Sequence, residues 1–192
     1  MERRSYEKYR WFFTSGGTLV VGGKSAEQNE EIISRIMKIK NYTVFHTASP
    51  GSPFCVIKNP TEKEIKEVAI FTACFSQDWK RAKKEVEVHI FSSEQIVKKK
   101  GMKIGTFGIR GEVKKLKAKL GLVLDFQKGK LRALPLSASK NPILKIVPGD
   151  LTKEQAAQKI AEIIKDKLCY PIRKEEILQA IPSDKISVKK LK

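Results

Sequence analysis

The sequence predicts an α/β (α+β) fold, in which a mixed, mostly antiparallel sheet packs against two or three amphipathic helices. Short runs of β-branched and aromatic residues are separated by glycine-containing turns, which is typical of antiparallel hairpins. A Ser or Thr followed three residues later by Gln or Glu, the pattern of a capping box, marks three helix starts at Ser25, Thr61 and Thr152. With 192 residues, 41% of them hydrophobic, the chain is long enough to bury such a core.

The first predicted unit is a hairpin followed directly by a helix. Residues 10–14 and 18–21 form the two strands, and Ser15-Gly16-Gly17 is the turn because glycine adopts positive φ without steric cost. After Gly22-Gly23-Lys24, a helix is predicted from residue 26 to about residue 38. A helix start offers unpaired N–H groups and partial positive charge, so we expect an anion to be attracted there.

Hydrophobic periodicity places the remaining elements in order. Strands are predicted at residues 42–46, 54–58, 86–90 and 103–110, and a second helix starts at Thr61 and has Trp79 near its end. We expect that tryptophan in the core and not stacked on a base, given the apolar area that it buries. The later elements are a hairpin at residues 121–136, a strand at 143–147, a helix at 152–168, a short helix at 174–180 and a basic tail at 184–192.

The charge of the chain favours a polyanionic partner. The formal net charge is +18, from 39 Lys and Arg against 21 Asp and Glu, whereas the charge-rich surface of a thermophilic protein would be closer to balanced. Residues 98–132 carry twelve basic side chains and only two acidic ones. This segment is predicted to contact phosphates, with three consecutive lysines at residues 98–100 as charges that can be removed without affecting the fold.

Several short motifs follow one another along the chain, namely Arg10-Trp11-Phe12, Gly22-Gly23-Lys24, Asn29-Glu30, His46-Thr47, Gly51-Ser52, residues 94–97, Gly105-Thr106-Phe107 and Arg110-Gly111. In this order they resemble the NFACT-R domain, which is the RNA-binding module of the NFACT proteins. The resemblance covers about residues 9–115. It implies an RNA-binding domain over residues 1–115, and the strands that continue beyond it predict that residues 116–192 form an α/β extension packed on that domain.

The resemblance implies a stand-alone RNA-binding module of the translation or ribosome quality control machinery, and not an enzyme. The implied partner is tRNA or ribosomal RNA, with the large ribosomal subunit as a further possible partner. The candidate RNA contacts, from the resemblance and the basic segment together, are Arg10, Trp11, Lys24, Asn29, His46, Thr47, Ser52, Lys98, Lys99, Lys100, Arg110, Lys114 and Lys115. For His46 an alternative stays open, in which the ring packs against a hairpin and bonds to a backbone carbonyl.

Other function classes find little support in the residues. There is no P-loop, no Gly-x-Ser-x-Gly turn and no His-Glu-x-x-His pair. His46 with Cys55 or Cys74 would be a conceivable nucleophile–base pair, but both cysteines lie in apolar contexts typical of core packing. Two alternatives therefore remain beside RNA binding, namely an RNA-modification enzyme or its accessory subunit, and a protein-interaction adaptor on the ribosome.

The sequence indicates no cofactor, no metal site and no disulfide. Its three cysteines are far apart and do not show the paired spacing of a zinc site. The apolar runs are too short to cross a membrane, and the N-terminus does not resemble a signal peptide. A cytoplasmic protein without a membrane partner is expected.

Overall fold

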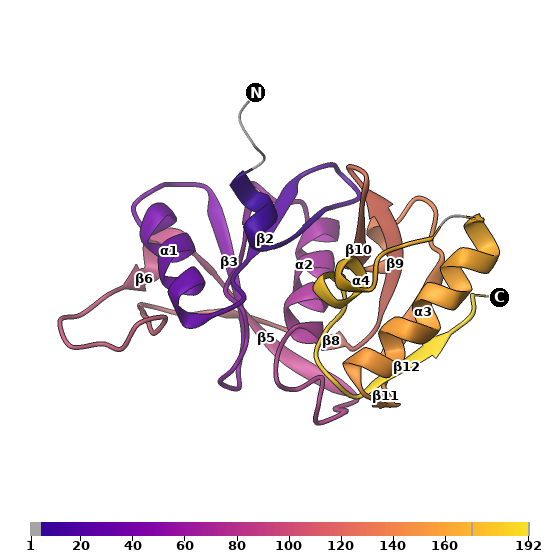
Figure 1. Cartoon of the computed structure of the whole chain (residues 1–192). Helices are drawn as coiled ribbons and strands as arrows, with labels where there is room; N and C mark the ends of the chain where they lie inside the picture. Colours follow the sequence, from indigo (N-terminus) through magenta and orange to yellow (C-terminus); the bar gives the residue numbers. More distant parts are fainter. Residues whose placement is uncertain (1–4, 170, 192) are drawn as a thin grey trace.

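Antiparallel sheets and α-helices alternate along the chain in the computed structural model, which describes residues 5–169 and 171–191 (Figure 1). The predicted α+β class is therefore confirmed. The larger sheet has six strands, in the spatial order β1 (Arg10–Phe13), β2 (Leu19–Gly22), β4 (Cys55–Lys58), β3 (Tyr42–Thr47), β5 (Glu85–Ser92) and β8 (Lys114–Lys119). Short 3-10 helices lie at Ser5–Lys8, Ser93–Gln95 and Leu136–Ala138.

Two helices cover the two faces of this sheet. Side chains alternate across a strand, so neighbouring residues of β3 enter different cores. Val44 lies in a cluster with the isoleucines of α1 (Ala26–Ile36), whereas Phe45 lies in a cluster with α2 (Glu62–Cys74). We call these two sides the α1 face and the α2 face.

The second half of the chain builds a four-stranded sheet with two helices on it. The strand order is β10 (Lys130–Leu134), β9 (Leu122–Gln127), β11 (Leu144–Leu151) and β12 (Ile186–Lys189), and the helices are α3 (Lys153–Leu168) and α4 (Lys174–Ala180). The tail predicted only as basic therefore contains a strand, because Ile186 is buried and β12 pairs with β11. Figure 1 shows α1 at one end of the molecule and α3 at the other.

The two halves share their hydrophobic cores. Cys74 and Trp79 lie in the cluster of α3 and the four-stranded sheet, while Val123 and Leu134 lie in the cluster of α2. Trp79 follows the end of α2 and is fully buried, which confirms its core placement but corrects its position on the helix. The expected boundary after residue 115 falls inside β8, which pairs with β5 over its whole length.

The strand predicted at residues 103–110 is wrong over most of its length. Only β7 (Gly108–Ile109) is extended, paired with β6 (Ile96–Val97), and the intervening residues form a loop that projects beside α1 (Figure 1). Gly105 explains the difference, because its φ of +73° is incompatible with a strand. A Cβ at this position would also come within 2.9 Å of the Ala26 Cα, so glycine allows the loop to lie against the start of α1.

Two of the three predicted capping boxes form completely, at Thr61 and Thr152. At Ser25 the hydroxyl accepts from the Gln28 N–H as expected, but the Gln28 side chain accepts from the Lys24 N–H instead of that of Ser25. The Gln28 side chain therefore orders the backbone at Lys24. None of the helices within the described residues is both long and apolar enough to span a membrane.

Candidate nucleic-acid interface

A cleft of about 580 Å³ extends from the α1 face of the six-stranded sheet, where His46 and His89 line it, past the strand ends to Phe75 at the end of α2. Its walls are the loop before α1, the turn between β3 and β4, the middle of β5, the residues just after α2, and residues 104–109 of the projecting loop. Five of the predicted contact residues line it, namely Arg10, Lys24, Asn29, His46 and Ser52. The fold thus brings together residues that are 42 positions apart in the sequence.

Arg10 is fixed in the cleft wall by three contacts. Its backbone pairs with Gly22, its guanidinium donates to the Gly23 carbonyl, and the same group lies 5.2 Å from the centre of the Phe75 ring. Burial lowers the pKa of the guanidinium, which nonetheless stays charged. Among the described residues, no ion pair neutralises Arg10, so this half-buried cation remains available to an anion.

Lys24 lies beside Arg10 at the start of α1, where its side chain reaches solvent but its surroundings still partly desolvate the ammonium group. The pKa of its ammonium group is lowered by burial and by repulsion from nearby Arg10, Arg132 and Lys153. Sequence analysis did not name Arg132 or Lys153 as site residues, because both come from the second half of the chain and their charges approach Lys24 only through the fold. A concentration of cations of this kind favours the binding of an anion.

Asn29 and the turn between β3 and β4 hold the backbone that forms the wall of the cleft. Asn29 Oδ1 accepts from the Phe54 N–H at 3.1 Å and thereby joins α1 to β4. Thr47 is buried, and its N–H donates to Ser52 Oγ at 3.1 Å. A Cβ at Gly23 would lie 2.1 Å from Asn29 Oδ1, so only glycine permits this close approach. These polar residues therefore hold backbone in place.

His46 both packs against neighbouring residues and lines the cleft, so the packed position and the position at the binding surface, left open by the sequence, apply together. Its Nδ1 lies 2.7 Å from the Thr47 carbonyl and its ring packs on Phe54 at 4.4 Å between ring centres, yet the side chain also lines the cleft. Burial lowers the pKa of His46, with a smaller contribution from His89. The ring is therefore held mainly neutral at pH 7 and presents an aromatic surface.

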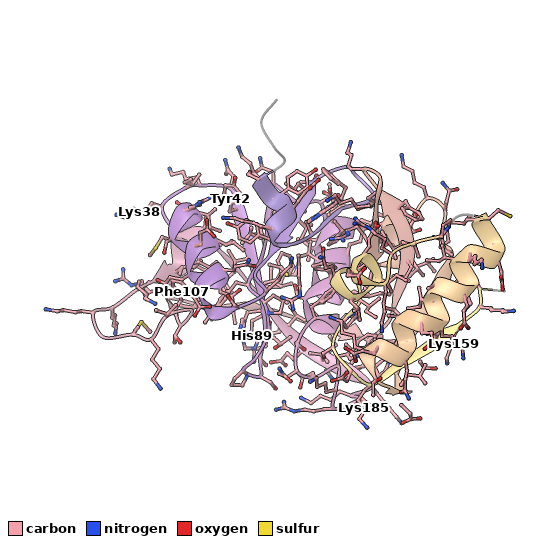
Figure 2. All side chains as sticks on the ribbon, in the orientation of Figure 1. Lys38, Tyr42, His89, Phe107, Lys159 and Lys185 are labelled. Carbon is pink, nitrogen blue, oxygen red and sulfur yellow. The ribbon has the colours of Figure 1, made fainter. Side chains whose placement is uncertain are left out.

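Sequence analysis missed the other rings of the cleft. His89 lies directly opposite His46 in the pairing of β5 with β3, and its Nε2 is 2.9 Å from Glu87 Oε1. Phe107 and His89, both labelled in Figure 2, line the cleft from the projecting loop and from β5. The alternation of apolar residues along β5 did place His89 on the opposite face from Val88, which was the available signal.

Lys98 differs from the exposed Lys99 and Lys100. Its ammonium group donates to Glu30 Oε2 at 2.7 Å and to the carbonyls of Lys103 and Thr106 at 2.9 and 3.0 Å. It also lies 4.6 Å from the centre of the Phe107 ring. Lys98 therefore fastens the projecting loop to α1, and the expectation that all three lysines can be removed without affecting the fold is corrected for this residue.

The remaining predicted residues lie outside the cleft. Trp11 has 1% of its surface exposed and packs edge-on against Tyr6, with Arg132 4.8 Å from the centre of its ring. It lies in the core, so we no longer place it among the RNA contacts. Arg110 is exposed, and its main chain bonds to Gln95.

Lys114 and Lys115 are neighbours on β8 but point to opposite faces of the sheet. Lys114 pairs with Glu62 of α2 at 3.2 Å, whereas Lys115 pairs with Glu87 at 3.5 Å and stands opposite His89. Both side chains are more than half exposed, at 52% and 59%. Only Lys115 lies on the α1 face, so Lys115 stays among the candidate RNA contacts and Lys114, which points toward α2, does not.

The two cysteines considered as nucleophiles are both fully buried in the core. Burial raises the pKa of the Cys55 and Cys74 thiols to about 12, so neither forms the reactive thiolate at neutral pH. Within the described residues, no group of His, Cys, Asp and Glu side chains is arranged to hold a metal ion.

Comparison with known proteins places this chain in a family. Residues 8–111 match the family model described as the NFACT protein RNA binding domain. The chain is 32% identical to the archaeal Rqc2 homolog aRqcH of Methanocaldococcus jannaschii, over 94% of this chain and 29% of that protein. It is 34% identical to the ribosome quality control complex subunit NEMF homolog of Drosophila melanogaster, over 56% of this chain and 12% of that protein.

A solved structure shows a related fold. The C-terminal part of the fibronectin/fibrinogen-binding protein from Streptococcus suis is 27% identical, with a TM-score of 0.52 over 62% of this chain and 51% of that one. The chain spans less than a third of the length of the curated relatives named above. The family model matches more than half of the chain, and the chain therefore belongs to the NFACT-R family of RNA-binding domains.

Proposed function

We propose that this chain is an RNA-binding module that acts in ribosome quality control, where it contacts tRNA or ribosomal RNA, with the large ribosomal subunit as its site of action. The module binds and does not catalyse. The family match and the names of the relatives support the general role. The finer part of the proposal is that a basic surface around the cleft contacts the RNA.

The observation that carries this proposal is the pair of cations at the cleft, Arg10 and Lys24. The Arg10 guanidinium is half-buried, held between the Gly23 carbonyl and the Phe75 ring, and no carboxylate of the described residues pairs with it. A fixed, partly desolvated guanidinium binds phosphate more strongly than an exposed lysine does, because its fork of donors is already oriented. Structured RNA supplies such phosphates.

The proposed contacts divide into two groups. The direct contacts are Arg10, Lys24, His46, Lys99, Lys100, Arg110 and Lys115, which lie in the cleft or on the exposed surface. The second group comprises Asn29, Thr47, Ser52 and Lys98, whose hydrogen bonds hold the backbone around the cleft. Residues of the second group act on binding through the shape of the cleft.

The test is a binding titration with purified tRNA, a ribosomal RNA fragment and isolated large subunits at moderate salt. We expect Lys24→Ala to weaken binding measurably, whereas Lys58→Ala, which removes an exposed lysine at the far end of β4, is a control of equal charge. If the parent chain binds none of the three partners, the proposed function is wrong. Equal affinities for the two variants would remove the cleft from the contact surface.

We also propose that residues 1–115 and 116–192 form two parts that fold only together. Cutting after Lys115 removes four residues of β8 and takes Val123 and Leu134 out of the core of α2. A chain ending at Lys115 should therefore be poorly soluble and sensitive to proteolysis. A cooperative unfolding transition like that of the full chain would show that the first part is independent.

A further inference from the structure

We propose that the α1 face of the sheet binds a single-stranded stretch of RNA, with one unpaired nucleotide in the cleft and the neighbouring phosphates on the lysines of β8. This inference rests on the proposed function and names the form of RNA that the site takes.

The walls of the cleft suit a nucleobase. Four half-buried rings line it, those of His46, Phe75, His89 and Phe107. Aromatic side chains that remain partly accessible are platforms on which unstacked bases pack, and this is how proteins commonly hold single-stranded RNA. Arg10 and Lys24 stand at the same cavity and supply positive charge for the sugar–phosphate of the bound nucleotide.

The cavity admits one nucleotide but no base-paired helix. Its volume of about 580 Å³ lies within the range of pockets that enclose one small ligand, roughly 300–1,000 Å³. The projecting loop closes one side through Ile104, Gly105 and Thr106, and Lys98 fastens that loop to α1. A base that enters the cleft must therefore leave its stack and its partner.

A row of lysines continues the cleft across the sheet. The pairing of β3 with β5 and of β5 with β8 places His46, His89 and Lys115 side by side on the α1 face. Lys117 follows Lys115 on the same face, since alternate residues of a strand share a side, about 6.7 Å further along β8. Both lysines are exposed, and β8 is the edge strand of the sheet. A single-stranded RNA that leaves the cleft can therefore pass over these two lysines.

Adjacent lysines of β8 provide a matched pair of variants. Lys114→Gln and Lys115→Gln remove the same charge from neighbouring positions of similar exposure, each paired with one glutamate, but on opposite faces. The double variant with Lys115→Gln and Lys117→Gln should weaken binding of single-stranded RNA about tenfold. It should also reduce the salt slope, which is the slope of log affinity against log salt concentration, by about 1.4, or about 0.7 for each phosphate contact. Lys114→Gln should leave both values unchanged.

The test compares a labelled single-stranded RNA of about ten nucleotides, within the usual range of site sizes, with a blunt RNA duplex of the same length. The full chain should bind the single strand at least about fivefold more tightly, the lower end of what stacking of one base contributes. Thr106→Trp, at an exposed position of the cleft wall, should abolish this preference and leave duplex binding unchanged.

Two results would overturn the inference. One is equal binding of the duplex and the single strand by the parent chain, and the other is equal weakening by Lys114→Gln and Lys115→Gln. The substituted lysines lie on the surface, so their variants should fold. Their comparison therefore tests the inference even if Thr106→Trp does not fold. Binding of tRNA or large subunits by the same protein would then leave the proposed function standing, whereas loss of all RNA binding would remove both.

Discussion

The cleft and the lysine-rich segment 98–132 are both positively charged, but they hold their charges in different ways. In the cleft, Arg10 is half-buried and oriented by the Gly23 carbonyl and the Phe75 ring. In the segment, Lys99, Lys100 and Lys115 are exposed, and their charges are screened by solvent and salt. Composition therefore locates charge along the chain, whereas packing decides how far each charge is desolvated and oriented.

The largest effect is expected at Arg10. Arg10→Ala should cost roughly 1–3 kcal/mol of RNA binding, because a charge-assisted, partly desolvated contact to phosphate is lost. Arg10→Lys is the sharper variant, since it keeps the charge but loses the planar fork. Affinity for tRNA is measured at moderate salt, with thermal unfolding as the check on folding. If Arg10→Lys binds RNA as tightly as the parent, a charge in the cleft contributes no more to RNA affinity than an exposed charge in the segment.

A smaller loss is expected at Lys98, which belongs to the segment in sequence but fastens the loop that forms one wall of the cleft. Lys98→Met removes the ammonium group that joins Glu30 to the carbonyls of the projecting loop, and should cost about 1 kcal/mol of binding by loosening the cleft wall. Amide hydrogen exchange should accelerate at residues 99–107. Lys99→Gln is the matched control, and similar exchange in the two variants would refute the fastening role.

Removal of Lys99 and Lys100 together should have a modest effect that depends only on charge. Both side chains are exposed, so the double change to Gln should weaken binding of every RNA alike and lower the salt slope by at most about one unit per residue. Titrations at several salt concentrations measure the slope. A loss that depends on the RNA sequence would contradict this view and would show base contacts in the segment.

The smallest expected effect is a pH dependence of the stability of the fold, caused by His46. Burial lowers the pKa of His46 in the folded chain below the ordinary histidine value of 6.5, so the unfolded state binds more protons as the pH falls below that value. Stability should therefore decrease from pH 6.5 down to the folded pKa, with His89 and the Thr47 carbonyl as the groups facing the ring. His46→Gln should remove this part of the decline in urea unfolding, and an unchanged profile would contradict it.

Local chemistry allowed much of the fold to be predicted from the sequence. The first hairpin, the starts of α2 and α3 and the hairpin of β9 with β10 depend on residues that are close in the chain, such as the capping box at Thr61. The family was also recognisable, because its motifs are short and ordered. Failures came where distant contacts override local pattern, as in the loop around Gly105, which lies against Ala26.

The site itself shows the same division. The sequence determined which residue types were present, namely Arg10, Lys24, His46 and the basic segment, and it predicted that their charge favours a polyanionic partner. Only the tertiary structure decided that Trp11 is buried, that His89 and Phe107 complete the cleft, and that Lys114 and Lys115 face opposite ways. The physical reason is that composition counts charges along a chain, whereas strand pairing and burial determine the face and the solvent contact of each side chain.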